Sequence, residues 1–455
     1  MTSHGSAVDT AVELAAVDAE LNTRWPETKL EPSTARIAAL VDLLGSPQRG
    51  YPVVHVAGTN GKTSVARMVD ALLTRLGLRT GRYTSPHLQS VTERISLDGV
   101  PIGQRRYLDV YRDVEPYLAL VDAAQPIPMS KFEVLTGMAF AAFADAPVDA
   151  AVVEVGLGGT WDATNVVDAA VAVITPIGVD HVEYLGTDVA GIAGEKAGIV
   201  KPGSIAVLAD QPPEVQRVLL GRAADVDATV AREGMEFGVL ARTVAVGGQQ
   251  LRLQGLGGVY EDLFLPLHGA HQASNAALAL AAVEAFLGAG ASRQLDLDAV
   301  AEGFAAVTSP GRLERLRAAP AVFADAAHNP HGARALAAAL REFAFRRLAA
   351  VVATMAEKDS RGILAELEPV VDEVVVTRNS SPRATDVDEL AAVAVEIFGA
   401  DRVSVQPRLD DAVSAAVQLA EDIGGDDQLA GSGVVITGSV VTVGEARTLF
   451  GKEPA

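Results

Sequence analysis

The sequence predicts a two-domain α/β protein in which mostly parallel sheets are covered by helices. Apolar, β-branched runs alternate with helical segments from Tyr51 almost to the end of the chain. The 455 residues are enough for two or three domains of about 150 residues each. They are 49% hydrophobic and 21% charged, which is ordinary for a protein with large buried cores.

The first predicted unit begins with a helical leader that contains Trp25-Pro26. Residues 229–267 differ from the rest of this unit, because short alternating runs between glycine pairs predict a small antiparallel excursion. An alanine-rich helix at about 271–287 closes the unit. The apolar runs predict five strands, with helices between most of them, at residues 53–57, 80–83, 150–155, 170–175 and 205–209.

Pro310-Gly311 predicts a hinge, and the pattern of a doubly wound, Rossmann-like unit follows it. Its strands are expected near residues 322–324, 349–353, 373–376 and 434–437. We therefore predict an N-terminal domain over residues 1–309 and a smaller C-terminal domain over 313–455. Clefts between domains are favoured ligand sites, so the chemistry is expected between these two units.

Composition excludes several classes of protein. A formal net charge of -21 disfavours nucleic-acid binding over the bulk surface. The absence of cysteine excludes disulfides, iron–sulfur clusters and thiolate zinc sites. The acidic N-terminal segment is unlike a signal peptide, and no run of eighteen uncharged apolar residues occurs. We expect a cytoplasmic protein without membrane contact, and the acidic surface is compatible with a monomer.

A glycine turn between the first strand and a helix predicts a phosphate-binding loop. Gly58 and Gly61 permit backbone angles that side chains forbid, and the free amides of the first helical turn face an anion. Lys62 is expected to reach the terminal phosphates, and a hydroxyl of Thr63 or Ser64 to bind a divalent metal. The sequence thus predicts use of a nucleoside triphosphate. The predicted loop residues are Gly58, Thr59, Asn60, Gly61, Lys62, Thr63 and Ser64.

The spacing is a shortened form of the Walker pattern, because the first glycine of that pattern would fall at Val56. The alternative is a strand–helix turn that only happens to contain Gly-Lys-Thr. Lysine is scarce, however, with 7 lysines against 30 arginines. A lysine at this position is therefore less simply explained as part of the solvated surface.

Three further strands end in polar groups, at the edge where open α/β sheets bind ligands. One is followed by Ser85, and another carries Glu154 inside an apolar run. An unpaired buried carboxylate is costly, and a nearby cation would offset that cost. A third ends at Asp180-His181, which can also be a simple hydrogen-bonded pair. Oxygen-rich ligation favours Mg²⁺ or Mn²⁺.

From residue 36 to 445 the chain resembles the folylpolyglutamate synthase/dihydrofolate synthase family, a branch of the Mur ligase superfamily. A single such motif would be weak, but the ordered series is specific. The motifs that carry the resemblance are residues 55–64, 83–88 with 93–95, 130–133, 154–165, 174–186, 195–203, 310–314, 325–332, 437–439 and 443–445.

The resemblance implies a set of site residues. Ser85, Glu154 and His181 are similar to the family's metal ligands, and Lys196 to its carbamylated lysine. A neutral amine that captures CO₂ becomes an anionic oxygen ligand, although Lys196 could instead be a solvated helix residue. The nucleotide contacts implied are Asn275, Arg312, Asp325 and His328, and those on the pterin side are Ser130, Lys131, Phe132, Glu133, Trp161 and Asp162.

Three departures from the family pattern stand out. Thr63 occupies a position where folate ligases usually carry glycine, and Gly-Lys-Thr is typical of the peptidoglycan branch. Thr160-Trp161 replaces the arginine and leucine that often precede Asp162, although an indole could stack on a ring. The tail at 437–443 lacks the usual aromatic residue.

The function implied is ATP-dependent ligation of L-glutamate to a reduced folate, to dihydropteroate or to both, with Mg²⁺ and through an acyl phosphate. Lys62, Lys196 and His181 are the expected catalytic residues. One alternative is a Mur-type ligase that adds an amino acid to a UDP-sugar peptide, but only about 50 residues precede the loop. Another is a P-loop ATPase that acts as a switch, which leaves the Lys196 and Asp325–His331 motifs unexplained.

Overall fold

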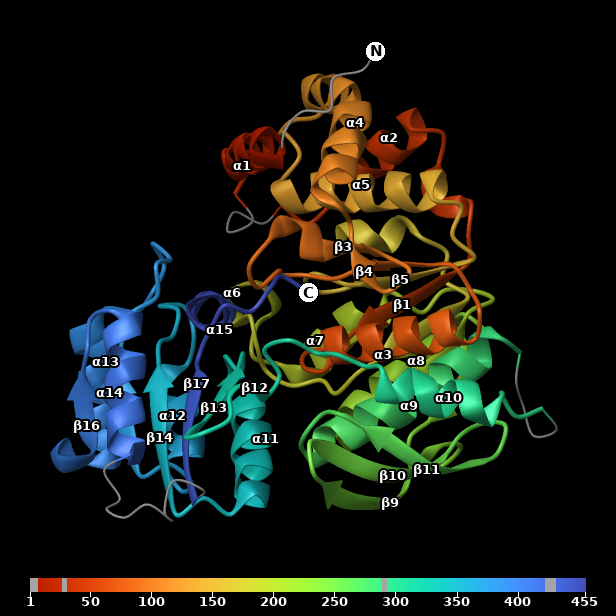
Figure 1. The fold of residues 1–455 in the computed structure, drawn as a ribbon. Helices are drawn as coiled ribbons and strands as arrows, with labels where there is room; N and C mark the ends of the chain where they lie inside the picture. The colour runs from red at the N-terminus through yellow and green to blue at the C-terminus, as the bar shows by residue number, and fades with distance from the viewer. Residues whose placement is uncertain (1–6, 27–30, 289–292, 422–430) are drawn as a thin grey trace.

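Two groups of elements lie side by side in the computed structural model, which describes residues 7–26, 31–288, 293–421 and 431–455 (Figure 1). The first domain ends with helix α10 (Leu297–Ala305), and the second begins with strand β12 (Glu314–Arg317). Residues 306–313 connect them, so the predicted hinge at Pro310-Gly311 falls between the two groups. The domain limits 1–309 and 313–455 stay a prediction, and parts of both lie outside the described residues.

An eight-stranded sheet forms the middle of the first domain, in the order β4-β3-β2-β5-β1-β6-β7-β8. The neighbouring strands β2, β5, β1, β6, β7 and β8 are parallel to one another. Strands β3 and β4 add an antiparallel edge beside β2. The five predicted strands are confirmed. The bounds are β1 Val53–Ala57, β2 Thr80–Tyr83, β3 Ile95–Leu97, β4 Val100–Pro101, β5 Ala150–Glu154, β6 Val171–Ile174, β7 Ile205–Leu208 and β8 Thr229–Arg232.

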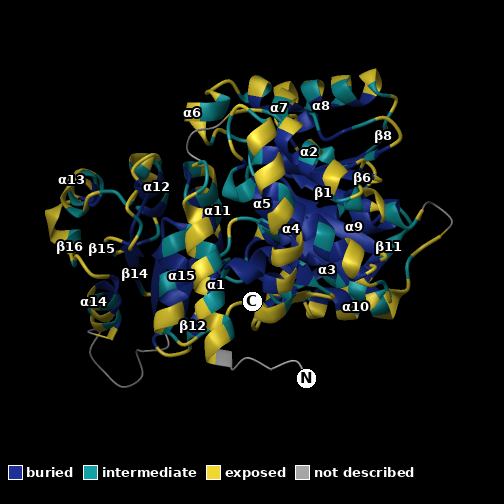
Figure 2. Cartoon of the chain, turned by 90° about the horizontal axis from the view of Figure 1, so that it is seen from above, coloured by how far each residue is buried: buried dark blue, intermediate teal, exposed yellow. Residues whose placement is uncertain are grey.

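Helices cover both faces of this sheet, and the central strands are buried throughout (Figure 2). Successive residues of β1 point to opposite faces, so Val53 joins the core under α2, α4 and α5, while Val54 joins the core under α3, α9 and α10. The helices are α1 Ala7–Asn22, α2 Ala35–Leu43, α3 Lys62–Arg75, α4 Gln104–Ala124, α5 Lys131–Asp145, α6 Val182–Leu185, α7 Val189–Ala197, α8 Pro213–Asp225, α9 Ala270–Phe286 and α10.

Two predictions about the first domain need correction. The leader helix ends at Asn22 and excludes Trp25, because Pro26 disfavours the helical conformation of the residue before it; Trp25 instead forms a bridge with Ser130. Strand β8 belongs to the main sheet, since α8 provides a parallel crossover from β7. The antiparallel excursion is shorter than predicted and consists of β9 Gly238–Ala245, β10 Gly248–Gln254 and β11 Val259–Leu265.

The second domain is a doubly wound α/β unit, as predicted, and its strands follow the order β12-β13-β17-β14-β15-β16. Helices α11, α12 and α13 pack on one face, and α14 and α15 on the other. The strands are β12, β13 Ala321–Asp325, β14 Arg347–Val352, β15 Glu373–Val376, β16 Val403–Val405 and β17 Ser432–Thr437. The helices are α11 Pro330–Leu340, α12 Ser360–Leu367, α13 Val387–Phe398, α14 Leu409–Glu421 and α15 Val440–Leu449.

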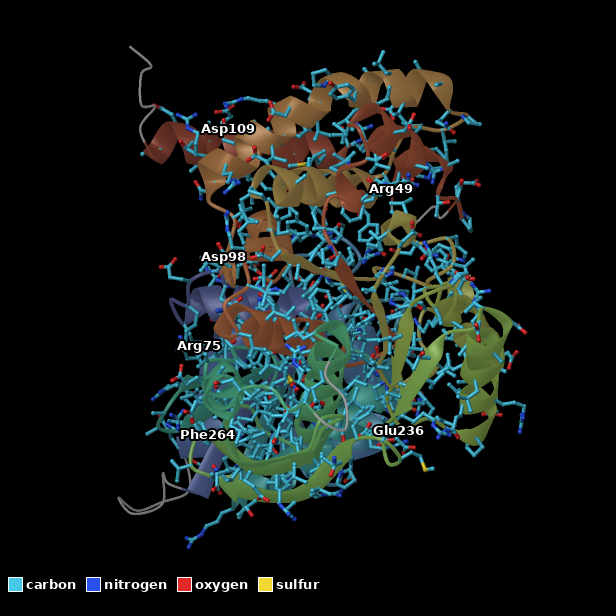
Figure 3. The ribbon with its side chains drawn as sticks, turned by 90° about the vertical axis from the view of Figure 1, so that its right-hand side faces the viewer. Arg49, Arg75, Asp98, Asp109, Glu236 and Phe264 are labelled. Atoms are coloured by element: carbon cyan, nitrogen blue, oxygen red, sulfur yellow. The ribbon has the colours of Figure 1, made fainter. Side chains whose placement is uncertain are left out.

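Charged side chains cover the outside of the first domain, as Arg75 and Asp109 illustrate in Figure 3. Among the described residues, none of the helices is long and apolar enough to cross a membrane. In the part of the chain that the structure describes, short 3₁₀ helices also lie at Pro47–Arg49, Val91–Arg94, Ala163–Val166, Arg341–Phe343 and Ala400–Arg402.

Candidate functional site

The predicted phosphate loop joins β1 to α3, which begins at Lys62. Gly58 has a φ of 148° and Gly61 a φ of 91°, both in the region that favours glycine. A Cβ on Gly58 would lie 1.8 Å from the hydroxyl of Thr175, and one on Gly61 would lie 2.8 Å from the amide oxygen of Asn275. Both glycines are therefore required by backbone angle and by space. The loop leads into the open amides of the first turn of α3.

Lys62 folds back over this loop. Its Nζ donates hydrogen bonds to the carbonyl oxygens of Gly58 at 3.1 Å and of Thr59 at 3.2 Å. Burial lowers the pKa of Lys62, whereas the charges of Glu154 and Asp180 act to raise it. The ammonium group thus lies over the loop and is held there by two neutral carbonyl oxygens.

A chain of four polar side chains connects α3, α9 and the linker between the domains. The Asn275 amide donates to Gln272 at 3.1 Å, and Gln272 donates to the hydroxyl of Ser64 at 3.3 Å. Ser64 in turn lies 3.2 Å from the hydroxyl of Ser309, one residue before the predicted hinge. Two predicted nucleotide residues, Asn275 and Ser64, are thereby brought to one place.

Glu154 ends β5 and is only 1% exposed. Its carboxylate accepts hydrogen bonds from the Thr63 hydroxyl at 2.9 and 3.1 Å and from the backbone amide of Ser85 at 3.3 Å. Burial raises the pKa of Glu154, and the nearby Lys62 charge and these hydrogen bonds oppose that rise. The structure therefore brings together three of the predicted metal ligands, Thr63, Ser85 and Glu154.

His181 lies at the start of α6 with a left-handed backbone (φ 52°), and its Nε2 is 3.9 Å from Asp180 Oδ2. Burial lowers the pKa of His181 to about 4, so the imidazole is neutral at pH 7, the state in which it binds metals. Within the described ranges, no three His, Asp or Glu side chains group closely enough to hold a metal by themselves. The donors present, a buried carboxylate with a hydroxyl beside it and a neutral imidazole, fit a hard cation that takes its other ligands from phosphate, water or a modified lysine.

Lys196 lies in the last turn of α7 and is 4% exposed. Burial and the charge of Lys62 lower its pKa to about 7, although Asp180 and Asp162 partly oppose this shift. Its neighbour Glu195 accepts a hydrogen bond from the backbone amide of Trp161 at 3.3 Å. At pH 7 a large fraction of the Lys196 amine is neutral, as carbamate formation requires.

The segment predicted to contact the pterin begins α5. Ser130 and Glu133 form a capping box, and Glu133 also pairs with Arg36 at 2.8 Å. Lys131 pairs with Asp18 of α1 at 2.6 Å. The side chains of Ser130, Lys131 and Glu133 are thus engaged in holding the local structure. The fourth residue of the segment, Phe132, has a partly exposed side chain.

Phe132 and Trp161 lie against two glycines of the loop that follows β5. A Cβ on Gly156 would lie 2.4 Å from Phe132, and one on Gly158 would lie 2.8 Å from Trp161. Asp162, 3% exposed, accepts hydrogen bonds at 2.9 Å from the backbone amides of two residues of this region, Leu157 and Thr164. The loop after Glu154 therefore has no side chain at Gly156 or Gly158, and an aromatic ring borders each of these positions.

Asp325 ends β13 and holds the linker in place. Its carboxylate accepts hydrogen bonds at 2.8 Å from the backbone amides of Leu313 and Ala327, and burial raises its pKa. Arg312 precedes Leu313, and its guanidinium donates to the carbonyl of Gly311 at 3.2 Å. Arg312, a predicted nucleotide contact, thus lies on the segment that joins the domains.

One group of contacts across the domain boundary centres on Asp180, which sequence reasoning treated only as the neighbour of His181. Lys358 lies 2.7 Å and His328 3.5 Å from its carboxylate, and Asn329 donates to it at 2.9 Å. Burial acts to raise the pKa of Asp180, but the hydrogen bond with His328 and the charges of its neighbours hold it well below its usual range. Sequence reasoning missed Lys358, and the scarcity of lysine was the signal that could have identified it.

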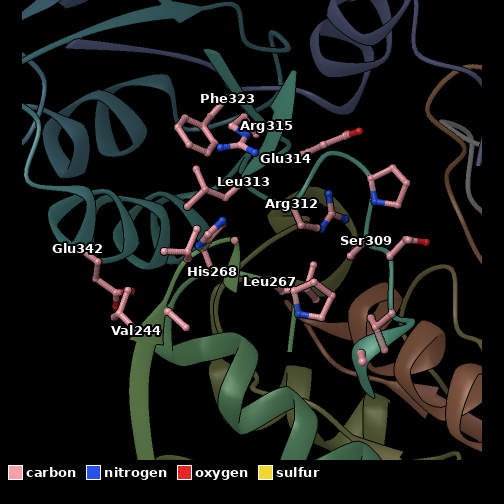
Figure 4. A pocket seen from close by; sticks show the side chains of 18 of the residues that line it. Val244, Leu267, His268, Ser309, Arg312, Leu313, Glu314, Arg315, Phe323 and Glu342 are labelled. Atoms are coloured by element: carbon pink, nitrogen blue, oxygen red, sulfur yellow. The ribbon is translucent and has the colours of Figure 1, made fainter. Parts of the chain in front are cut away.

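A cavity of about 640 Å³ opens beside the linker (Figure 4). It is lined by the turn between β9 and β10, by residues 305–310 and by strands of the second domain; of the predicted site residues, Arg312 lines it. His268, Phe323 and Phe343 form an aromatic wall, with ring centroids 4.8 to 6.3 Å apart.

A glycine loop that faces a buried carboxylate, next to a boundary between two α/β domains, is an arrangement suited to phosphoryl transfer. Two family models match the chain, the Mur ligase middle domain over residues 128–283 and the Mur ligase glutamate ligase domain over residues 311–440. The chain is thus an ATP-dependent ligase of the Mur ligase type.

Its relatives are named more narrowly. A dihydrofolate synthase/folylpolyglutamate synthase of Mycobacterium tuberculosis is 62% identical, covering 98% of this chain and 96% of that protein. A crystal structure of Mycobacterium tuberculosis folylpolyglutamate synthase with ADP and AMPPCP matches with a TM-score of 0.93 at 61% identity, over 98% of this chain and 100% of that one. The structure of E. coli FolC with DHPP and ADP matches with a TM-score of 0.81 at 30% identity, over 96% and 97%. This chain belongs to the dihydrofolate synthase/folylpolyglutamate synthase family.

Proposed function

We propose that this protein joins L-glutamate, at the expense of ATP, to a reduced folate, to dihydropteroate or to both. The observation that carries the proposal is the buried Glu154 carboxylate beside Thr63 of the phosphate loop, in a chain 62% identical to a dihydrofolate synthase/folylpolyglutamate synthase. The structure of a relative with DHPP and ADP supports a pterin substrate and a nucleotide on the same protein.

In this proposal, the phosphates of ATP bind the loop from Gly58 to Ser64, and the nucleoside of ATP points towards the linker. Lys62 then exchanges its carbonyl partners for phosphate oxygens. Asn275, Arg312 and Asp325 lie on the elements that border this path. His328 belongs to the second domain and lies at its boundary with the first domain, next to Asp180.

Mg²⁺ would be held by Glu154 with the hydroxyls of Thr63 and Ser85, by His181, and by a carbamate on Lys196. The support is the buried carboxylate without an ion pair among the described residues, the neutral imidazole, and a lysine pKa of about 7. When bound, the ion neutralises charge on the phosphate and carboxylate oxygens as it develops.

The reaction begins when a carboxylate oxygen of the pterin-bearing substrate attacks the γ-phosphorus of ATP, giving an acyl phosphate and ADP. The amine of L-glutamate then attacks the acyl carbon, and the tetrahedral intermediate expels inorganic phosphate. Lys62 stabilises charge on the transferring phosphoryl group through its fixed ammonium. Closure of the second domain at the linker excludes water that would hydrolyse the acyl phosphate.

The pterin ring is placed against the loop after β5, where Phe132 and Trp161 border Gly156 and Gly158. Aromatic rings in offset contact contribute about 0.5–1.5 kcal/mol beyond their buried area. Ser130, Lys131, Glu133 and Asp162 then act by shaping this wall, since their polar atoms are engaged with the protein. A monomer remains our expectation for the oligomeric state.

The test is incubation of the purified chain with ATP, radiolabelled L-glutamate and either dihydropteroate or tetrahydrofolate. We expect labelled product and ADP release that depend on both glutamate and the pterin compound. ADP release without any carboxylate acceptor would indicate a switch ATPase, and ligation only to a UDP-sugar peptide would indicate the peptidoglycan branch. Either result overturns the proposal.

A further inference from the structure

We propose that Asn329 is a positioning residue that couples docking of the second domain to the shape of the phosphate loop. The inference rests on the proposed function only in assigning ATP to that loop. Asn329 immediately precedes α11 in the second domain, yet two of its partners, Asn60 and Asp180, belong to the first domain.

The side-chain amide of Asn329 uses its whole hydrogen-bonding capacity. It is 3% exposed, and its Nδ2 donates to Asn60 Oδ1 at 3.2 Å and to Asp180 Oδ2 at 2.9 Å. Its Oδ1 accepts from the Gly332 backbone amide at 2.7 Å and from Asn60 Nδ2 at 3.3 Å. An asparagine amide offers two donors and two lone pairs, and all four are in use here.

The orientation of this amide is fixed by its partners. The backbone amide of Gly332 can only donate, so it must face Oδ1. The carboxylate of Asp180, which also pairs with the Lys358 ammonium at 2.7 Å, accepts from Nδ2. A rotated amide would therefore break two hydrogen bonds at once.

Asn60 turns its side chain to the second domain. Its Nδ2 contacts Asn329 and lies 2.8 Å from Nδ1 of His331, while its backbone amide donates to the carbonyl of Pro176 at 3.4 Å. It lies directly between Thr59 and Gly61 of the phosphate loop. The loop is thus held on one side by its own domain and on the other by residues of α11.

Separation of the domains would leave the cap of α11 intact but break the contacts of Asn329 with both Asn60 and Asp180. Buried polar groups without partners are costly, so the docked domain and this loop conformation stabilise each other. By reciprocity, whatever holds the loop in this conformation favours docking. Phosphoryl transfer is then fastest only when the second domain is in place.

The test is Asn329→Ser, because serine still caps a helix but lacks the amide donor. We expect kcat for ligation to fall about 10- to 100-fold, since small misplacements of reacting groups cost that much, with KM for ATP changed less than about 3-fold. The matched control is Asp386→Ser at the exposed cap of α13, where the side chain accepts from a backbone amide of its own helix, and this variant should keep wild-type kinetics. An unchanged kcat in Asn329→Ser, or equal losses in both variants, overturns the inference.

A double-mutant cycle with Asn60→Ala tests the coupling itself. In the Asn60→Ala background, Asn329→Ser should cost less than about 3-fold further, because the shared contact is already lost. If the loss of kcat in the double variant equals the product of the losses in the two single variants, the proposal is contradicted.

A readout that does not depend on ligation separates this inference from the proposed function. Small-angle X-ray scattering with AMPPCP should give a smaller radius of gyration for the wild type and Asp386→Ser than for Asn329→Ser. If the wild type ligates nothing but this difference appears, the substrate assignment fails and the coupling stands. If all three proteins have the same radius, the coupling fails.

Discussion

The hydroxyl of Thr63 lies 2.9 Å from one oxygen of Glu154 and 3.1 Å from the other, and so connects the start of α3 to the end of β5. Thr63 is one of the three departures of this sequence from the family pattern, since a glycine is usual there in folate ligases. A cation that binds the carboxylate here would also be within reach of the hydroxyl. The departure therefore adds an oxygen donor at the place where the buried charge is found.

Glu154→Gln should raise the Mg²⁺ concentration required for half-maximal activity by at least about 10-fold, because a neutral amide is a weaker ligand for a hard cation. The measurement is initial ligation rate against Mg²⁺ concentration at saturating ATP. Glu302→Gln, an exposed residue of α10 whose ion pair with Arg75 is also exposed, is the control and should give the wild-type curve. Identical Mg²⁺ curves for all three proteins would remove Glu154 from the metal site.

Lys62→Ala should reduce kcat for ligation by about 10³-fold or more, because the charge that stabilises the transferring phosphoryl group is lost. Circular dichroism and the thermal midpoint should stay near those of the wild type. Arg75→Ala removes a positive charge from the other end of the same helix, where the side chain is 52% exposed, and should keep normal activity. Near-wild-type turnover in Lys62→Ala would show that the loop does not bind the reacting phosphates.

Lys196→Ala should lose most ligase activity, and added acetate or formate should restore part of it by filling the vacated ligand position. Exhaustive removal of CO₂ should lower wild-type activity in the same way, and bicarbonate should restore it. Full activity of the wild type in CO₂-free buffer would count against a carbamate. Failure of rescue alone is weaker evidence, because a small anion must still reach a closed cleft.

The carbamate also predicts a pH dependence. With a pKa of about 7, roughly half of the Lys196 amine is neutral at pH 7, against less than about one part in a thousand for an ordinary lysine. At limiting bicarbonate, wild-type activity should therefore rise as the pH increases from 6 to 8. Excess bicarbonate should flatten that rise, and a profile indifferent to bicarbonate would contradict the assignment.

His55 predicts a pH dependence of stability. It is fully buried, its Nε2 is 2.9 Å from the Thr164 hydroxyl, and burial with the charge of Lys201 lowers its pKa to about 3. Between pH 6.5 and 3 the unfolded chain binds this proton and the folded chain does not. The free energy of unfolding should thus fall as the pH decreases through that window, by up to about 1.4 kcal/mol per pH unit from this group.

The measurement is urea unfolding of the wild type and His55→Gln between pH 7 and pH 4.5. The difference between the two proteins isolates His55, because the other buried histidines are common to both. We expect the variant to be less stable at pH 7 and its disadvantage to shrink as the pH falls. A constant difference over this range would show that His55 does not change its protonation on unfolding.

The sequence by itself determined the parallel strands, the glycine loop and the family. These features are local, since β-branched runs form strands and glycine readily adopts the positive φ angles of Gly58 and Gly61, which other residues rarely do. Short-range rules also explain the errors. Pro26 ended the leader helix early. Strand β8 pairs with β7 in the main sheet because the helix α8 connects the two strands in parallel, and the alternation of apolar residues does not reveal that connection.

Only the tertiary structure decided which polar groups are free to act. Lys131 and Glu133 were predicted on the pterin side, but their partners Asp18 and Arg36 lie about a hundred residues away and occupy them. Asn329 caps α11 through its own domain, yet its contacts with Asn60 and Asp180 arise from the docking of two domains. A pattern in sequence records which side chains are present and how they are spaced. Hydrogen-bond partners and burial depend on contacts between distant segments, and those contacts exist only once the chain is folded.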